Sequence, residues 1–179
     1  MSTARAAGAF WLLTIISGTC AFLAAGSLAT AAILVSTLCY LGATVLVYRL
    51  LKPVSARLSL VAALFSFAGC ALSVLAAFHA APEGINSLAF FGGHCFLVGV
   101  LIMRSIFLPR AVGALMTLAG LGWLTFVWPS LAKELAPFNM LPGIVGELTL
   151  SLWLLIKGVN GPAWDEAARA LLETTAHQS

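Results

Sequence analysis

Two ionisable side chains lie inside apolar stretches of the sequence, where such groups are expensive to place. Glu147 stands in the run GIVGELTLSLWLL (143–155), and His94 stands in the run FFGGHCFLVGVLI (90–102). An ionised carboxylate without a partner in an apolar medium costs several kcal/mol. Ionisable residues inside membrane segments are therefore candidates for a functional site. A carboxylate and an imidazole together have the chemistry to bind a cation or to transfer a proton.

The spacing of small and polar residues predicts how these two side chains are oriented. Gly143, Glu147 and Ser151 recur every four residues, so they share one face of a helix. Glu147 and His94 are each a few residues from the same end of their segments, which puts both at a depth of about 9–12 Å. We expect Glu147 to contact His94 and, with Ser151, to form a polar binding pocket in the outer half of a helix bundle. In the alternative interpretation, the contact only locks the helices together.

The composition identifies the medium around these helices. Of the 179 residues, 61% are hydrophobic and only 8% are charged, whereas a soluble domain carries about 25% charged residues. The chain is therefore expected to be solvated largely by lipid. The net charge of +3 is spread without a basic cluster, which argues against nucleic acid as a partner. No linker or repeat interrupts the chain, so one compact unit is expected.

The fold class expected is all-α, a bundle of six transmembrane helices followed by a short amphipathic C-terminal helix. A spanning helix needs about 20 apolar residues, and prolines mark most of the breaks between such segments. The spans are expected at residues 6–25, 28–50, 57–80, 86–107, 111–132 and 141–158. The bundle then occupies residues 1–158 and a cytoplasmic tail residues 159–179. The first segment resembles a signal peptide, but further apolar segments follow at once, so a retained span is expected.

The distribution of Lys and Arg predicts the orientation, with both termini in the cytoplasm. Only Lys133 then lies outside, which is a strong positive-inside bias. The residues expected on the cytoplasmic side are Arg5, Arg49, Lys52, Arg57, Arg104, Arg110, Lys157 and Arg169. The expected location is the inner (plasma) membrane of a bacterium, with several passes through it.

Small residues and aromatic residues predict the packing. Ser59, Ala63, Ser66, Cys70, Ser73 and Ala77 alternate by four and three along one segment, a pattern that lets membrane helices approach closely. Trp123 and Trp128 are interpreted as anchors at the outer interface and Trp164 as one at the inner interface. The tail from Gly161 is expected to form a helix along the inner surface, a frayed solvated tail being the alternative. The four cysteines are expected to pack as small apolar residues.

Several stretches resemble a bacterial membrane family, domain of unknown function 4386. They are ARAAGAFWLLTIISG, YRLLKPVSARLSLVAALF, FFGGHCFLVGVLIMRSIFLPRAVGALMTLAGLGWL and LPGIVGELTLSLWLLIKGVN. The combination of RSIFLPR, GE and WLLIKGVN carries the resemblance, which covers nearly the whole chain. It implies a six-span helical membrane protein and no established activity.

Three hypotheses of function follow from these observations. The first is a protein that binds or transports a small lipophilic or cationic molecule at Glu147, His94 and Ser151, with proton coupling through Glu147 as one version. The second is a structural or accessory subunit that contacts a membrane partner, or a second copy of itself, through small-residue faces. The third, less favoured, is an intramembrane enzyme with Glu147 and His94 as its acid–base pair. We expect no cofactor: His94 is able to ligate haem, but His79 is too near the surface to complete the set. No metal-ligand spacing occurs.

Overall fold

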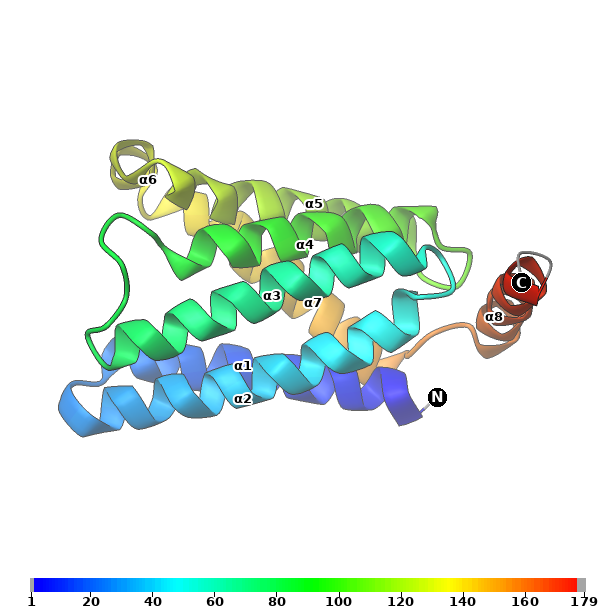
Figure 1. The fold of residues 1–179 in the computed structure, drawn as a ribbon, viewed down its shortest axis with the longest axis horizontal. Coiled ribbons are helices and arrows are strands. Elements are labelled where there is room, and N and C mark those ends of the chain that lie inside the picture. The colour runs from blue at the N-terminus through cyan, green and yellow to red at the C-terminus, as the bar shows by residue number, and fades with distance from the viewer. Residues whose placement is uncertain (1, 177–179) are drawn as a thin grey trace.

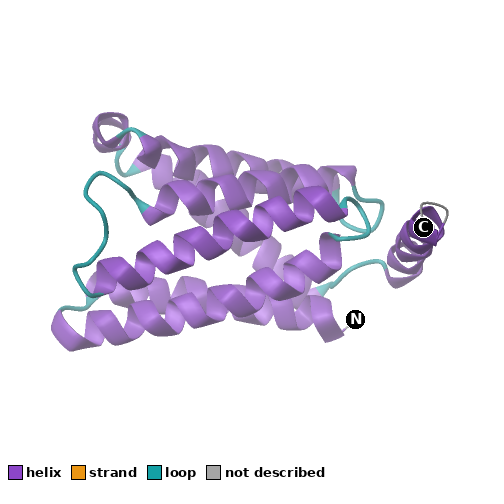
Figure 2. Ribbon diagram, in the orientation of Figure 1, coloured by secondary structure: helices purple, strands orange, loops and turns teal. Residues whose placement is uncertain are grey.

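The computed structural model describes residues 2–176, and this part of the chain is helical without any strand (Figure 2). The long helices are α1 (Ser2–Leu23), α2 (Gly26–Leu51), α3 (Ala56–Ala77), α4 (Ser87–Arg104), α5 (Arg110–Leu124), α7 (Leu141–Ile156) and α8 (Gly161–Ala176). Between α5 and α7 the chain forms a 3-10 turn, the short helix α6 (Pro129–Leu135) and a second 3-10 turn.

Six of these segments are long and apolar enough to cross a membrane, as the sequence predicted. Large apolar side chains such as Leu38, Leu64 and Leu118 are exposed on their outer faces, where water would solvate them poorly. The chain is a multi-pass membrane protein. Lipid is the solvent that this exterior fits.

The fifth predicted span is wrong at its end. Residues 111–132 were expected to form one helix, but α5 ends at Leu124 and α6 begins at Pro129. The residue before a proline is pushed out of the helical region, and Trp128 has the extended angles φ −115° and ψ 98°. The remaining predicted spans differ from the observed helices by a few residues at their ends.

The six spanning helices form a closed ring in chain order. Each packs against its neighbours in the sequence, from α1 through α5 to α7, and α7 closes the ring on α1 (Figure 1). Consecutive helices run antiparallel because short connections join them. The interior of the ring is therefore shared by all six helices, and a side chain on any of them is able to reach it.

Helix α7 runs obliquely behind the other helices (Figure 1), and glycines mark its two closest contacts. A Cβ on Gly146 would lie 2.5 Å from the Leu115 carbonyl oxygen of α5. A Cβ on Gly8 of α1 would lie 2.6 Å from the Ser151 carbonyl oxygen of α7. The first part of α7 thus packs on α5 and its last part on α1.

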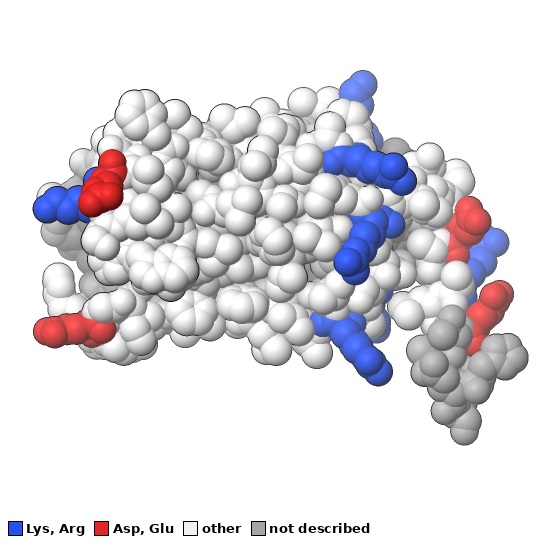
Figure 3. Space-filling view, turned by 90° about the horizontal axis from the view of Figure 1, so that it is seen from above, with Lys and Arg blue, Asp and Glu red and all other residues white. Residues whose placement is uncertain are grey.

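Charged side chains gather at the two ends of the ring, and an uncharged belt separates them (Figure 3). We call the end with connections 52–55 and 105–109 the basic end, because Arg49, Lys52, Arg104 and Arg110 lie there. The opposite end, with connections 24–25, 78–86 and 125–140, is called the far end. That the basic end faces the cytoplasm stays a prediction.

The predicted small-residue face of α3 and the C-terminal helix are both present. Ser59, Ala63, Ser66 and Cys70 are buried against the neighbouring helices. In α8, the Trp164 indole N–H donates to the Leu50 carbonyl oxygen at 2.9 Å, which ties this helix to the basic end. The last three residues of the predicted tail, 177–179, lie outside the described residues.

Candidate functional site

Glu147 lies inside the ring, 8% exposed, and accepts hydrogen bonds from three side chains. The Trp123 indole N–H donates to Oε1 at 2.7 Å, and the Trp11 indole N–H donates to Oε2 at 2.9 Å. The Cys95 thiol donates to Oε1 at 3.7 Å. Hydrogen bonds to a charged acceptor are worth more than those between neutral groups. The three donors therefore offset part of the cost of placing a carboxyl group among apolar helices.

Trp11 reaches Glu147 because α1 and α7 pack closely one turn away. Gly8 meets the α7 backbone at Ser151 and Leu155, where a Cβ would lie 2.6–2.7 Å from main-chain atoms. Since the helices are antiparallel, one turn onward on α1 corresponds to one turn back on α7. Trp11 is thereby set opposite Glu147, and its ring is completely buried.

Trp123 reaches Glu147 from α5 across a gap that Gly143 leaves open. A Cβ on Gly143 would overlap the six-membered part of the Trp123 indole ring. Gly143 precedes Glu147 by four residues, so it lies directly beneath the carboxylate on the same helix face. The glycine therefore makes room for the ring whose N–H binds Glu147.

The predicted contact between Glu147 and His94 is not formed. His94 Nδ1 lies 2.8 Å from the Ala62 carbonyl oxygen of α3, while its Nε2 has no hydrogen-bond partner in the described part of the chain. Trp11 contacts both residues, because its ring packs on the His94 ring with centroids 5.7 Å apart and its N–H binds Glu147. Matched depth was a sound inference, but a tryptophan on a third helix reaches the carboxylate. The acid–base pair that the enzyme hypothesis needs is therefore missing.

Three rings form a layer across the interior of the ring of helices. Trp11, Tyr40 and His94 contact one another, with centroid distances between 5.6 and 5.7 Å. The Tyr40 hydroxyl lies 3.8 Å from the Cys95 sulfur, which continues the contacts toward Glu147. We call Trp11, Tyr40 and His94 the aromatic layer.

A cavity of about 490 Å³ lies on one side of the aromatic layer. Glu147, Tyr40 and Trp123 contribute to its wall, and its other polar residues include Thr14 and Thr37. The apolar remainder of the wall includes Ile15, Ile33, Leu88, Phe91, Met140 and Ile144. Most of these residues belong to the halves of their helices that point toward the far end. The volume is large enough for a small organic molecule.

Of the three residues predicted to bind, Glu147 alone lines this cavity. His94 lies in the aromatic layer, and Ser151 is buried one turn further along α7. The Ser151 hydroxyl donates to the Leu148 carbonyl oxygen of its own helix at 3.0 Å. His94 and Ser151 therefore adjoin the site through Trp11 and through the α1–α7 contact, respectively.

Sequence reasoning missed both tryptophans that bind Glu147. Trp123 was interpreted as an anchor at the membrane interface, and Trp11 received no role. The signal was present in the pattern Gly143–Glu147, since a glycine one turn from a buried acid indicates space for a large partner. Cys95 was expected to be a simple apolar residue, yet its thiol contacts the carboxylate. Among the residues that the structure describes, no group of three His, Cys, Asp or Glu side chains is placed to hold a metal ion.

The family described as "Domain of unknown function (DUF4386)" matches residues 75–158. This range includes His94, Trp123 and Glu147. An "Uncharacterized protein" from Archaeoglobus fulgidus is 32% identical over 123 residues, which make up 64% of this chain and 74% of the relative. The chain belongs to the DUF4386 family. No solved structure matches it. The family description names no activity, so function must be argued from the cavity and its carboxylate.

Proposed function

We propose that this member of the DUF4386 family binds a small lipophilic cation in the cavity, with Glu147 as its counter-charge. One observation carries the proposal: a carboxyl group lines a cavity, and its three hydrogen-bond donors are all neutral side chains. Trp11, Trp123 and Cys95 satisfy lone pairs without supplying a positive charge. A cationic ligand would supply it.

The rest of the cavity wall suits an apolar body with one cationic group. Tyr40, Phe91 and Trp123 present aromatic rings to the cavity, and aromatic faces attract cations by about 0.5–2 kcal/mol. The aliphatic residues of the wall favour an apolar remainder over a sugar or a nucleotide. The ligand class is therefore a lipophilic ammonium rather than a metal ion.

The oblique course of α7 supports entry from the lipid. The two helices touch at Gly8–Ser151 and at Trp11–Glu147, on the side of the basic end. Beyond these contacts, the cavity lies between the second half of α1, at Gly18 and Phe22, and the start of α7, at Ile144. A lipophilic molecule would enter between these helices without crossing the far end.

Binding is the step that this geometry supports, and transport would require one more movement. The aromatic layer separates the cavity from the basic half of the ring, so a transported molecule would have to displace Trp11, Tyr40 or His94. We place the basic end in the cytoplasm on the positive-inside bias and the protein in the plasma membrane. The cavity then faces the outer leaflet. His94 and Ser151 act as positioning residues that hold Trp11 and α7 in place.

A matched pair of probes tests the proposal. Benzyltrimethylammonium and its neutral isostere neopentylbenzene share a shape and differ in charge, and isothermal titration calorimetry on the purified protein in detergent measures both. We expect the cation to bind at least tenfold more tightly, about 1.4 kcal/mol, and Glu147→Gln to remove that preference. Gln keeps the size of the side chain and one acceptor. Equal affinity for the two probes, or an unchanged preference in a folded Glu147→Gln protein, overturns the proposal.

A variant that fills the cavity separates this site from binding elsewhere in the micelle. A Cβ on Gly18 would have Ser36 Oγ as its nearest neighbour, at 3.4 Å. Gly18→Leu should therefore place its side chain in the cavity and abolish binding of benzyltrimethylammonium without unfolding the protein. Binding that survives in folded Gly18→Leu protein would locate the probe outside the cavity and contradict the proposal.

A further inference from the structure

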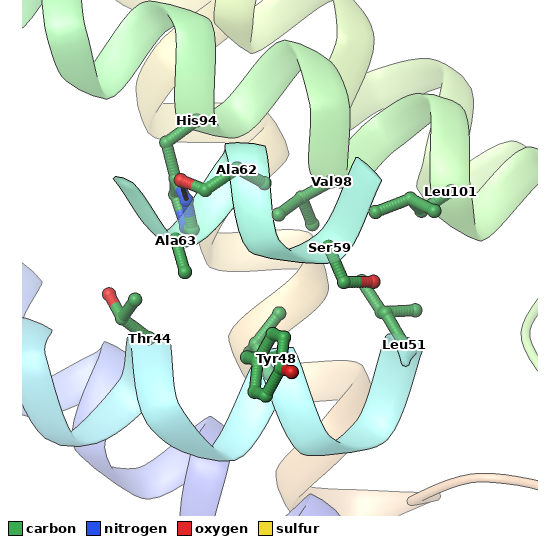
Figure 4. A pocket seen from close by; sticks show the side chains of 10 residues that line it. Thr44, Tyr48, Leu51, Ser59, Ala62, Ala63, His94, Val98 and Leu101 are labelled. Carbon is green, nitrogen blue, oxygen red and sulfur yellow. Dashed lines mark hydrogen bonds between the residues drawn. The ribbon is translucent and has the colours of Figure 1, made fainter. Parts of the chain in front are cut away.

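A second, much smaller void lies between α2 and α3, and His94 reaches it from α4 (Figure 4). Its volume is about 10 Å³, and Thr44, Ser59 and His94 are among the polar residues that line it. Two of their polar atoms, Ser59 Oγ and His94 Nε2, are buried without a hydrogen-bond partner in the described structure. Both residues are 2% exposed. Two unsatisfied polar groups at one void require an explanation.

The hydrogen bond of the other ring nitrogen fixes what His94 needs at Nε2. Nδ1 lies 2.8 Å from the Ala62 carbonyl oxygen, and a carbonyl oxygen only accepts, so Nδ1 carries a proton. In the neutral imidazole, Nε2 is then an acceptor. The missing partner of His94 must therefore be a hydrogen-bond donor. Ser59 Oγ is able to donate or accept, so it imposes no conflict.

The void has the size and the polarity that a single water molecule requires. About 10–15 Å³ of space for a probe of water size holds one water, and such a water needs two to four polar partners. Here His94 Nε2 and Ser59 Oγ provide two. Thr44 Oγ1 also lines the void, although it already donates to the Tyr40 carbonyl oxygen and pairs with Ser66.

We propose that this void is a hydration site in which one water molecule donates to His94 Nε2 and hydrogen-bonds to Ser59 Oγ. The site lies on the other side of the aromatic layer from the cavity, since His94 belongs to the layer and Tyr48 and Leu51, near the basic end of α2, close the void (Figure 4). Water reaches it from the basic end. The inference is independent of any ligand in the cavity.

The variant Ser59→Ala distinguishes a hydrated void from a dry one by the sign of its effect. If a water is bound, removing the Ser59 hydroxyl deprives that water of a partner, and the unfolding equilibrium constant in detergent should rise at least threefold. If the void is dry, Ser59→Ala removes an unsatisfied hydroxyl, and the protein should be equally stable or more stable. The matched control is Ser73→Ala on the same helix, because Ser73 lines the large cavity and not the void.

A second pair of measurements keeps the proposal testable if stability changes are ambiguous. In a His94→Leu background no Nε2 needs the water, so the effect of Ser59→Ala should shrink to less than twofold; an unchanged effect overturns the proposal. A high-resolution structure of the unmodified protein should show solvent density within about 3.2 Å of both Ser59 Oγ and His94 Nε2. A clear map without such density overturns it as well.

Discussion

The two halves of the helix ring are built from similar residues and differ in how they are filled. On the far side of the aromatic layer the ring encloses a cavity of about 490 Å³, and on the basic side it is packed around a void of about 10 Å³. The polar groups differ in the opposite sense. Glu147, at the cavity, has three donors, whereas His94, among tightly packed side chains, keeps one nitrogen without a protein partner.

The course of α7 explains the difference. On α1, Gly8 and Gly18 are both small residues of the kind that lets helices approach. At Gly8 the α7 backbone is so near that a Cβ would lie 2.6 Å from it, while at Gly18 the nearest atom is a serine hydroxyl at 3.4 Å. The same residue type therefore gives either close packing or a cavity wall, depending on whether the partner helix crosses there.

The largest expected effect concerns the orientation of the two halves across the membrane. A cysteine at Val54, in the connection at the basic end, should be labelled by an impermeant maleimide only from the cytoplasm. A cysteine at Glu83, in the far-end connection, should be labelled only from outside. The positive-inside bias is the reason, and the parent protein sets the background. Labelling of the Glu83 position from the cytoplasm alone would reverse the two halves.

Removal of the carboxylate should destabilise the protein more than any other single change at the cavity. Glu147→Ala leaves the Trp11 and Trp123 indole N–H groups without an acceptor, and an unsatisfied buried donor costs about 1–3 kcal/mol. We expect a loss of about 2–4 kcal/mol in the free energy of unfolding, measured by denaturant titration in detergent. Glu147→Gln, which keeps one acceptor, should cost about half as much. Equal stability of the Ala variant and the parent would refute the role of the two tryptophans.

Two glycine variants test why one half is packed and the other hollow. Gly143→Ala should push Trp123 away from Glu147 and cost about 1–3 kcal/mol of stability, as overpacking does. Gly18→Ala should cost nothing and is able to gain up to about 1 kcal/mol, because alanine favours a helix and space is available. Thermal unfolding of both variants decides. If Gly18→Ala were the more damaging change, the cavity would not be where the structure has it.

Ser151→Ala should have the smallest effect. Its hydroxyl bonds only to the Leu148 carbonyl oxygen of the same helix, and such a bond contributes about 0.5–1 kcal/mol. We expect affinity for benzyltrimethylammonium to change by less than about twofold, since Ser151 does not line the cavity. A tenfold loss of affinity, with stability preserved, would instead place the Ser151 hydroxyl in direct contact with the ligand.

The fold was largely predictable because membrane spans leave a strong local signal. Long apolar runs, prolines at the breaks and the small-residue face of α3 each follow from adjacent residues. The end of α5 escaped prediction because the segment after Leu124 is apolar as well, and only the angles imposed at Trp128 by Pro129 separate it.

The site was predictable only in part. The isolation of Glu147 in an apolar run marked it as buried, and the Gly143–Glu147–Ser151 face correctly pointed inward. Its partners could not be derived, because they depend on which helices neighbour α7 in the ring. Closure of α7 on α1 brings Trp11 to the carboxylate over 136 residues of sequence, and no local pattern encodes that contact.

Anomalous diffraction tests the central claim most directly. Crystals of the protein soaked with 4-bromobenzyltrimethylammonium should show a bromine peak inside the cavity, with the ammonium group next to Glu147 and the aromatic ring among the apolar residues of its wall. The peak should be absent from crystals of Gly18→Leu. A bromine peak only on the lipid-facing surface, or an unaltered peak in Gly18→Leu crystals, would contradict the account.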